Sequence, residues 1–166
     1  MHVHELSFEV DAPPEMVWAL FWSHRSGVLS YGDVTIEILH PGDATGEGLI
    51  RHATFPVPRY LLSGGTGRSW EWLTEVKPPE SWRYVAIGKP LWSRAEGTTR
   101  LEDLGDGRTR VHFCETYHAM SPVVRLLLER PVHRFISRNN DRLMREGIEA
   151  GVRAIADAAS DPAQRD

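Results

Sequence analysis

The chain has 166 residues, of which 41% are hydrophobic and 25% charged, an ordinary composition for one globular domain. Its net charge of −4 argues against general nucleic-acid binding, since phosphate contacts need an excess of Lys and Arg over acids. No apolar run approaches the roughly 20 residues that span a bilayer, no secretory signal is recognisable, and Cys114 is the single cysteine. We therefore expect a cytoplasmic protein. Because only Lys77 and Lys89 of the 19 basic residues are lysine, we also expect a bacterial, GC-rich source.

Alternating apolar and polar residues from Val3 to Val10 predict a half-buried first strand. Asp11 and the prolines after it suit the first turn of a short helix, which the apolar cluster over 17–22 continues. After two breaking glycines, the alternation over 34–38 predicts a second strand that ends at a Pro-Gly turn. The N-terminal part is thus expected to contain two strands with short helices between them.

The middle of the chain consists of further strands without intervening helices. Strands are expected at about 48–55, 68–76, 82–88 and 93–104, separated by Pro and Gly clusters. The sequence Gly105-Asp106-Gly107 predicts a tight hairpin turn, because Asp-Gly accepts the positive φ angles that such turns need. A last strand follows from Thr109 to Tyr117. Successive hairpins predict an antiparallel meander of about seven strands.

The C-terminal part is expected to be one long amphipathic helix. Apolar residues recur at three- and four-residue steps from Pro131 to about Ala159, and Pro131 is expected to kink or divide the helix. Residues 160–166 are expected to be a frayed tail. The chain is therefore predicted to be a single α+β domain over residues 1–159.

Four segments carry a resemblance to a known family. They are 8–18 (FEVDAPPEMVW), 46–48 (GEG), 74–79 (TEVKPP) and 107–111 (GRTRV). In this order they resemble the START-like helix-grip superfamily (SRPBCC), and within it the polyketide cyclase/dehydrase and lipid-transport group. The resemblance covers nearly the whole chain, although 56–67 is unusually rich in Pro and Gly.

The resemblance implies a curved antiparallel sheet around the long C-terminal helix, with a cavity for an apolar ligand between them. It transfers no catalytic residues, because the shared motifs are structural. Three functions stay open: a non-catalytic binding or carrier protein for a lipid or polyketide-like molecule, a cofactor-independent aromatase/cyclase, and a protein-interaction module similar to chaperone activators. No cofactor is expected.

Glu115, Tyr117 and His52 are the candidate catalytic residues if the protein is an enzyme. Strand alternation turns Glu115 and Tyr117 toward the core or cavity. Glu115 is then either a general base or ligand anchor, or one half of an ion pair with an arginine such as Arg51. His52 would serve as an acid/base near neutral pH if it faced inward, but its direction is undecided from the sequence.

The candidate ligand-binding residues are mostly aromatic, because flat apolar rings suit a cavity that stacks fused rings. Six tryptophans are present, and they either line such a cavity or fill the core. Two residues on the long helix and one arginine complete the set. The predicted ligand-binding residues are Arg51, Trp70, Trp72, Tyr84, Trp92, Phe113, Asn139 and Leu143.

A metal site is not expected, since no third ligand at suitable spacing completes the pair His2 and His4. Arginines at steps of four form a basic ridge along the long helix: Arg130, Arg134, Arg138 and Arg142. This ridge is either a solvated face or a docking surface for an acidic partner, such as an acyl carrier protein or an anionic lipid surface.

Overall fold

The structure is a computed structural model that describes residues 2–22, 25–31, 33–61 and 64–160, without the side chains of Tyr31, Asn139 and 156–160. Its elements, in chain order, are β1 (His2–Val10), α1 (Pro14–Trp22), β2 (Gly27–Tyr31), β3 (Val34–His40), β4 (Ile50–Pro56), β5 (Thr66–Lys77), β6 (Ser81–Ile87), β7 (Trp92–Gly105), β8 (Arg108–Ala119), α2 (Pro122–Val124), the π-helical turn η1 (Arg125–Glu129) and α3 (Arg130–Ser160).

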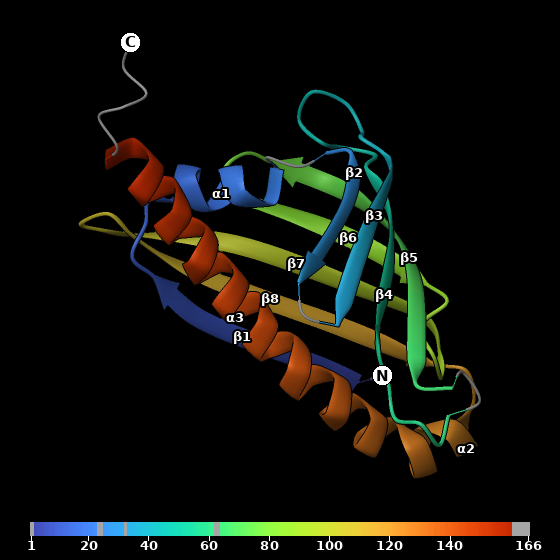
Figure 1. The fold of residues 1–166 in the computed structure, drawn as a ribbon. Coiled ribbons are helices and arrows are strands. Elements are labelled where there is room, and N and C mark those ends of the chain that lie inside the picture. Colours follow the sequence, from blue (N-terminus) through green and yellow to red (C-terminus); the bar gives the residue numbers. More distant parts are fainter. Residues whose placement is uncertain (1, 23–24, 32, 62–63, 161–166) are drawn as a thin grey trace.

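The strands form one curved antiparallel sheet, and α3 lies across its concave face (Figure 1). The strand order is β1-β8-β7-β6-β5-β4-β3-β2, so the meander predicted from the hairpins is confirmed and β1 pairs with β8. The described residues contain eight strands rather than about seven. The additional strand is β2, which the sequence did not reveal because it is only five residues long and lies between two glycines.

Alternation along the paired strands decides which side chains face α3. Leu6, Phe8 and Val10 of β1 oppose Phe113, Val111 and Thr109 of β8, and these side chains share the concave face. The buried Thr109 Oγ1 donates a hydrogen bond of 2.6 Å to the carbonyl of Ala12, which fixes the chain just before α1 against the sheet. The core therefore lies between the concave face, α1 and α3.

The helix α3 continues from η1 without a break. Pro131 has no N–H, so it cannot donate the α-helical hydrogen bond to the carbonyl of Leu127. A wider π turn over Arg125–Glu129 replaces the α-helical turn that would need this hydrogen bond. The expected kink or division thus takes the form of a π turn. Val132, Ile136, Ile148 and Val152 are buried along the inner side of α3. In the part of the chain that is described, no helix is long and apolar enough to cross a membrane.

Candidate functional site

Several buried polar side chains gather on the concave face beneath α3, where an apolar core alone would be expected. The first group, the Glu115 cluster, consists of Lys89, Glu115 and Tyr117. Glu115 is 2% exposed, and its two carboxylate oxygens accept hydrogen bonds from Lys89 Nζ and from the Tyr117 hydroxyl. The ion pair expected between Glu115 and an arginine such as Arg51 is therefore made with Lys89 instead.

Lys89 comes from the connection between β6 and β7 and lies 9% exposed. Its Nζ lies 5.8 Å from the ring centroid of Tyr84 and 5.5 Å from that of Tyr117, so two aromatic faces flank the ammonium group. Burial, together with the negative charge of Glu115, raises the pKa of Tyr117 well above its ordinary value. Tyr117 is thus a neutral hydroxyl donor.

A second group, the Glu71 cluster, consists of Arg51, Ser69 and Glu71 on β4 and β5. Arg51 Nε donates to Glu71 Oε2 at 2.8 Å, and Ser69 Oγ donates to Glu71 Oε1 at 2.9 Å. Burial of Glu71 raises its pKa, but the charges of Arg51 and Lys89 and the hydrogen bonds to Ser69 and Arg51 outweigh burial, so the pKa of Glu71 is lowered. Glu71 is therefore a buried carboxylate that keeps its charge.

Tyr84 joins the two clusters. The guanidinium carbon of Arg51 lies 5.7 Å from the Tyr84 ring centroid, on a ring that Lys89 also approaches. The ring occupies the space over Gly97 of β7, where a Cβ atom would come within 2.1 Å of Tyr84 Cε1. Burial, and then the charges of Glu115 and Glu71, raise the pKa of Tyr84 well above its ordinary value. The array is thus a row of charged groups and neutral hydroxyls along the sheet.

Histidines from β1 and α3 adjoin the Glu115 cluster. The ring of His133 lies 4.0 Å from that of His2, 5.1 Å from that of His4 and 4.9 Å from that of Tyr117, measured between centroids. Burial lowers the pKa of His133 to about 4, and the charges of His2 and His4 add to this. The pKa of His4 is raised, because its Nε2 is hydrogen-bonded to Asp141 Oδ1 at 2.8 Å. His133 is therefore neutral near pH 7.

The tryptophans of the interior pack against one another and against neighbouring rings. Trp82 is 4% exposed and packs against Trp18, Phe21 and Trp22 at centroid distances of 5.4, 4.7 and 5.9 Å. Trp92 is 1% exposed, and its Nε1 donates to the buried Glu129 at 3.1 Å. The buried Nε1 of Trp22 has no hydrogen-bond partner among the described residues. The described part of the interior is thus densely aromatic, and Trp22 Nε1 is an unused side-chain donor within it.

His52, Trp70 and Trp72 lie on the convex face, although the first was a catalytic and the other two were ligand-binding candidates. The register pairs Trp70 with His52, whereas their neighbours Glu71 and Arg51 face α3. Trp70 is 44% exposed, and its ring lies 4.8 Å from that of His52. Since a strand alternates its side chains, these three residues cannot contact a ligand held between sheet and helix.

The other predicted ligand-binding residues fall in or beside the core. Arg51, Tyr84, Trp92 and Phe113 face the interior, and Leu143 of α3 packs against the same cluster. The side chain of Asn139 lies outside the described residues. Sequence reasoning missed Lys89, Glu71 and His133. The only available signal for Lys89 was the scarcity of lysine in the sequence. For Glu71 the signal was strand alternation, but the inner face of that strand had been given to the neighbouring Trp70 and Trp72.

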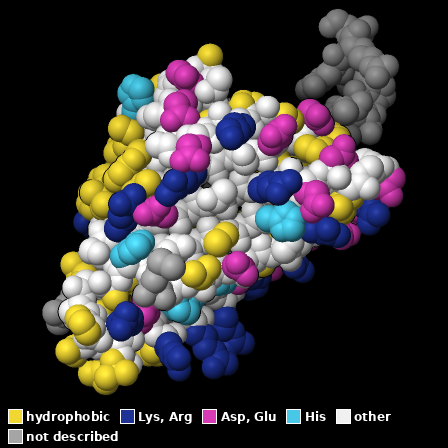
Figure 2. All heavy atoms as spheres, turned by 180° about the vertical axis from the view of Figure 1, so that it is seen from behind, with side chains coloured by type: hydrophobic (Ala, Val, Ile, Leu, Met, Phe, Trp, Pro, Cys, Tyr) yellow, Lys and Arg dark blue, Asp and Glu magenta, His cyan; other side chains and the backbone are white. Residues whose placement is uncertain are grey.

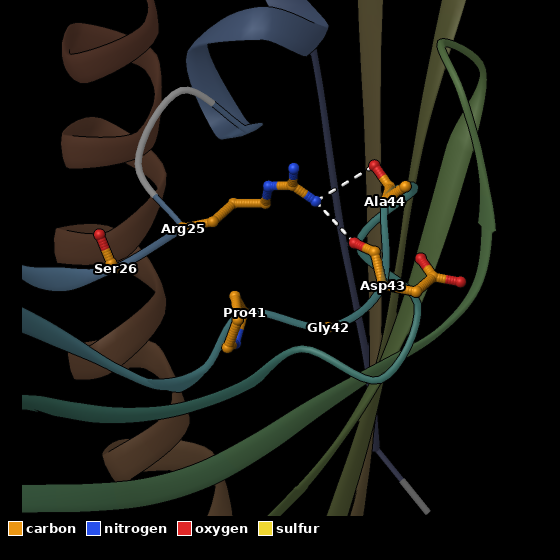
Figure 3. A pocket seen from close by; sticks show the side chains of 6 residues that line it. All are labelled: Arg25, Ser26, Pro41, Gly42, Asp43 and Ala44. Carbon is orange, nitrogen blue, oxygen red and sulfur yellow. Dashed lines mark hydrogen bonds between the residues drawn. The ribbon is translucent and has the colours of Figure 1, made fainter.

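Two hollows lie on the surface of the described part of the chain. One, of about 450 Å³, is lined by 25–26 and 41–44, and Arg25 Nη1 donates there to the carbonyls of Asp43 and Ala44 at 2.7 and 3.1 Å (Figure 3). It contains no buried charged group. The other is lined by 118–122 and Arg125. Within the described ranges, no group of three or more His, Cys, Asp or Glu residues is placed to hold a metal ion.

Comparison with solved structures shows the same fold in other proteins. TTHA0849 from Thermus thermophilus matches at 22% identity with a TM-score of 0.65, covering 96% of this chain and 100% of that one. A START superfamily protein from Mycobacterium smegmatis matches at 11% identity and a TM-score of 0.66, covering 93% and 99%. The Zhui aromatase/cyclase from Streptomyces sp. R1128 matches at 14% identity with a TM-score of 0.65, covering 98% of both chains.

A comparison with curated proteins found no match. The family model described as polyketide cyclase/dehydrase and lipid transport, however, matches residues 1–149, which is most of the chain. That match agrees with the resemblance in the sequence and with the sheet and long helix of the structure. The chain belongs to the polyketide cyclase/dehydrase and lipid transport family.

Proposed function

We propose that this chain binds a small molecule with an apolar, ring-bearing body between the concave face and α3, and that Lys89 holds a polar oxygen of that molecule. The observation that carries the proposal is the buried Glu115 cluster. Two opposite charges and a hydroxyl lie under the helix, where apolar side chains alone would give a simpler core.

The chemistry of the cluster favours an anchor over a general base. Both oxygens of Glu115 already accept hydrogen bonds from groups of the protein, one from Lys89 and one from Tyr117. An ammonium group, by contrast, has three donors, and Glu115 accepts one from Lys89. A carbonyl, phenolate or carboxylate oxygen of the ligand can accept another. Glu115 then holds the Lys89 ammonium group in position beside the ligand.

The aromatic side chains near the cluster suit the rest of such a ligand. Tyr84 and Tyr117 flank Lys89, and Trp18, Trp22 and Trp82 form a continuous aromatic group toward α1. Rings of this kind stack on planar apolar molecules, and the unused Trp22 Nε1 can donate to a second polar atom. Because the rings now pack on one another, binding requires that α1 or α3 shift away from the sheet.

Native mass spectrometry of the purified chain tests the proposal first, since a tightly held molecule is expected to co-purify as an added mass. Quenching of tryptophan fluorescence by the released molecule, or by a polycyclic phenol, then measures affinity. Lys89→Met should weaken binding at least tenfold, because a charge-assisted hydrogen bond is lost. Lys77→Met, which changes the other lysine at an exposed position, should leave affinity unchanged.

Two results would contradict the proposal. One is the absence of a bound mass together with no fluorescence response to any polycyclic phenol, which would favour a protein-interaction module with a filled interior. The other is equal affinity of the wild type and Lys89→Met for a ligand that does bind.

An aromatase/cyclase is the second candidate, and the position of the His133 ring, 4.9 Å from that of Tyr117 in the Glu115 cluster, favours it. A ring closure on a poly-β-ketone needs a base to remove an α-proton and a donor to stabilise the enolate. His133 is uncharged near pH 7 and its ring adjoins Tyr117, which adjoins Lys89. His133 would take the α-proton and Lys89 would hold the enolate oxygen. The enolate carbon would then bond to a ketone carbon of the same molecule, whose oxygen would take the proton back from His133.

A linear poly-β-ketone offered as an N-acetylcysteamine thioester tests this candidate. If the chain is a cyclase, ring-closed products form faster with the wild type than with His133→Gln, while Trp fluorescence reports equal substrate affinity for the two proteins. Product formation at the same rate with His133→Gln, or at the rate seen without protein, would remove His133 from the reaction.

A further inference from the structure

The α2 end of the molecule presents apolar side chains to solvent. Met120, Val123, Leu126 and Leu127 are 69%, 65%, 81% and 64% exposed. These four residues, here called the α2 tip, come from the turn after β8, from α2 and from η1. Such exposed apolar clusters are uncommon on the surfaces of monomeric proteins and mark places of contact with another molecule or a membrane. The tip needs an explanation other than packing.

The charge next to the α2 tip is strongly positive, although the whole chain is acidic at −4. Arg125, Arg130, Arg134 and Arg138 are exposed and have no ion pair with any described residue. The one acid between Met120 and Asn140 is Glu129, which is 4% exposed and hydrogen-bonded to Trp92 inside the protein. Arg142, the last residue of the predicted ridge, has another interaction and lies farther along α3.

The apolar and basic groups share one end of the molecule. Figure 2 shows hydrophobic and Lys/Arg side chains gathered side by side at its lower left. This is the end of the molecule that carries α2, which lies at the lower right in the opposite view of Figure 1. Val123, Leu127, Arg130 and Arg134 follow one another at steps of three and four, so they continue along one side of the helical segment. A flat surface that receives the tip would also meet the arginines.

An open hollow lies beside the tip and adds a polar contact. It has a volume of about 240 Å³ and is lined by His118, Met120, Ser121 and Arg125, with Ala119 and Pro122. A phosphate group in this position would face the guanidinium of Arg125 and the hydroxyl of Ser121. The hollow therefore lies between the apolar side chains of the tip and further arginines.

We propose that the α2 tip and its arginines dock this protein on an anionic phospholipid bilayer. The apolar side chains would enter the boundary between headgroups and acyl chains, and the arginines would remain at the level of the lipid phosphates. An acidic protein is the competing partner for this surface. A protein partner would be expected to bind in a groove, whereas four apolar side chains here protrude from the end of the fold. The proposal is independent of the proposed function, because docking needs no ligand in the interior.

Sedimentation of the full chain with vesicles tests the proposal. Binding is expected to vesicles that mix phosphatidylcholine with phosphatidylglycerol, to be weak with phosphatidylcholine alone, and to fall as salt is raised. The double variant Leu126→Gln/Leu127→Gln should lower the partition coefficient at least tenfold. Arg130→Gln/Arg134→Gln should lower it about fivefold for each charge removed.

Matched controls separate the surface from general changes in charge and apolarity. Ile87 is 45% exposed and Arg100 is also exposed, both outside the α2 tip, so Ile87→Gln and Arg100→Gln should bind vesicles like the wild type. Circular dichroism confirms that each variant is folded. Equal binding to neutral and anionic vesicles, or binding unchanged in both double variants, would overturn the proposal. Binding of an acidic acyl carrier protein at these residues without vesicle binding would also overturn it.

Discussion

Breaking the Glu115 cluster one partner at a time should cost more stability than removing the pair. The side chains of Lys89 and Glu115 are 9% and 3% exposed, so either charge left alone would be buried without its ion-pair partner. Loss of one partner from a buried ion pair typically costs about 3–5 kcal/mol, a large part of the roughly 5–15 kcal/mol that holds a domain folded. Glu115→Gln and Lys89→Met should each lower the free energy of unfolding by about that amount.

The double variant Lys89→Met/Glu115→Gln should cost less than either single variant, because no unpaired charge remains and the glutamine still accepts the Tyr117 hydroxyl. Urea denaturation at pH 7, followed by tryptophan fluorescence, measures all three. Arg108→Gln is the matched control: it breaks an ion pair with Glu9 whose side chains are 43% and 45% exposed, and should cost less than about 1 kcal/mol. The reasoning is refuted if the single variants cost no more than this control, or if their costs simply add in the double variant.

Three further predictions concern the surroundings of the cluster. Gly97→Ala should destabilise the protein by about 1–3 kcal/mol and weaken ligand binding, because the new Cβ would displace the Tyr84 ring. In the same urea titration Gly147→Ala on α3, whose new Cβ would meet nothing within 4 Å, should instead stabilise the protein by about 0.5–1 kcal/mol. The pKa of His133 is about 4 when folded, against 6.5 for a free histidine, so the unfolded chain binds more protons and stability should fall as pH drops from 6.5 toward 4. His133→Gln should flatten that fall while His118→Gln does not, and an unchanged pH slope in His133→Gln would assign the fall to other groups. Tyr117→Phe should cost about 1.5–3 kcal/mol, the range for a hydrogen bond to a charged group, and a cost near zero in thermal unfolding would mean that Glu115 does not depend on this donor.

The sequence predicted the architecture well because its signals are local. The hairpin at Asp106-Gly107 is confirmed, with φ angles of 52° and 79°, since only a few residue pairs accept positive φ at both positions. The alternation over 109–117 correctly turned Glu115 and Tyr117 inward. The strand β2 was missed because five residues between glycines give too short a pattern to distinguish a strand from a loop.

The candidate site was less predictable because its residues meet through register and long-range contacts. On β5 the alternation itself is evident, but the larger apolar side chains suggested the wrong inner face. Glu71 faces inward because Arg51 on β4 neutralises it, a contact between residues 20 positions apart. Lys89 lies in a connection without periodicity, and His133 contacts β1 from the opposite end of the chain. Such contacts between distant residues form only when the chain folds, so no short stretch of sequence shows a pattern that predicts them.

The charges that the fold buries and those that it exposes can be explained together. Inside, Glu115 and Glu71 are each matched by a cation and a hydroxyl, so the interior holds charge without needing water. Outside, the arginines from 125 to 138 have no such partners among the described residues, because the one acid among them, Glu129, is turned inward to Trp92. That inward turn leaves the α2 end both apolar and positive, while it holds the start of α3 on the sheet beside the Glu115 cluster. The Trp92–Glu129 hydrogen bond, with the Trp92 ring 4.8 Å from that of Tyr117, thus connects the exposed α2 end to the buried Glu115 cluster.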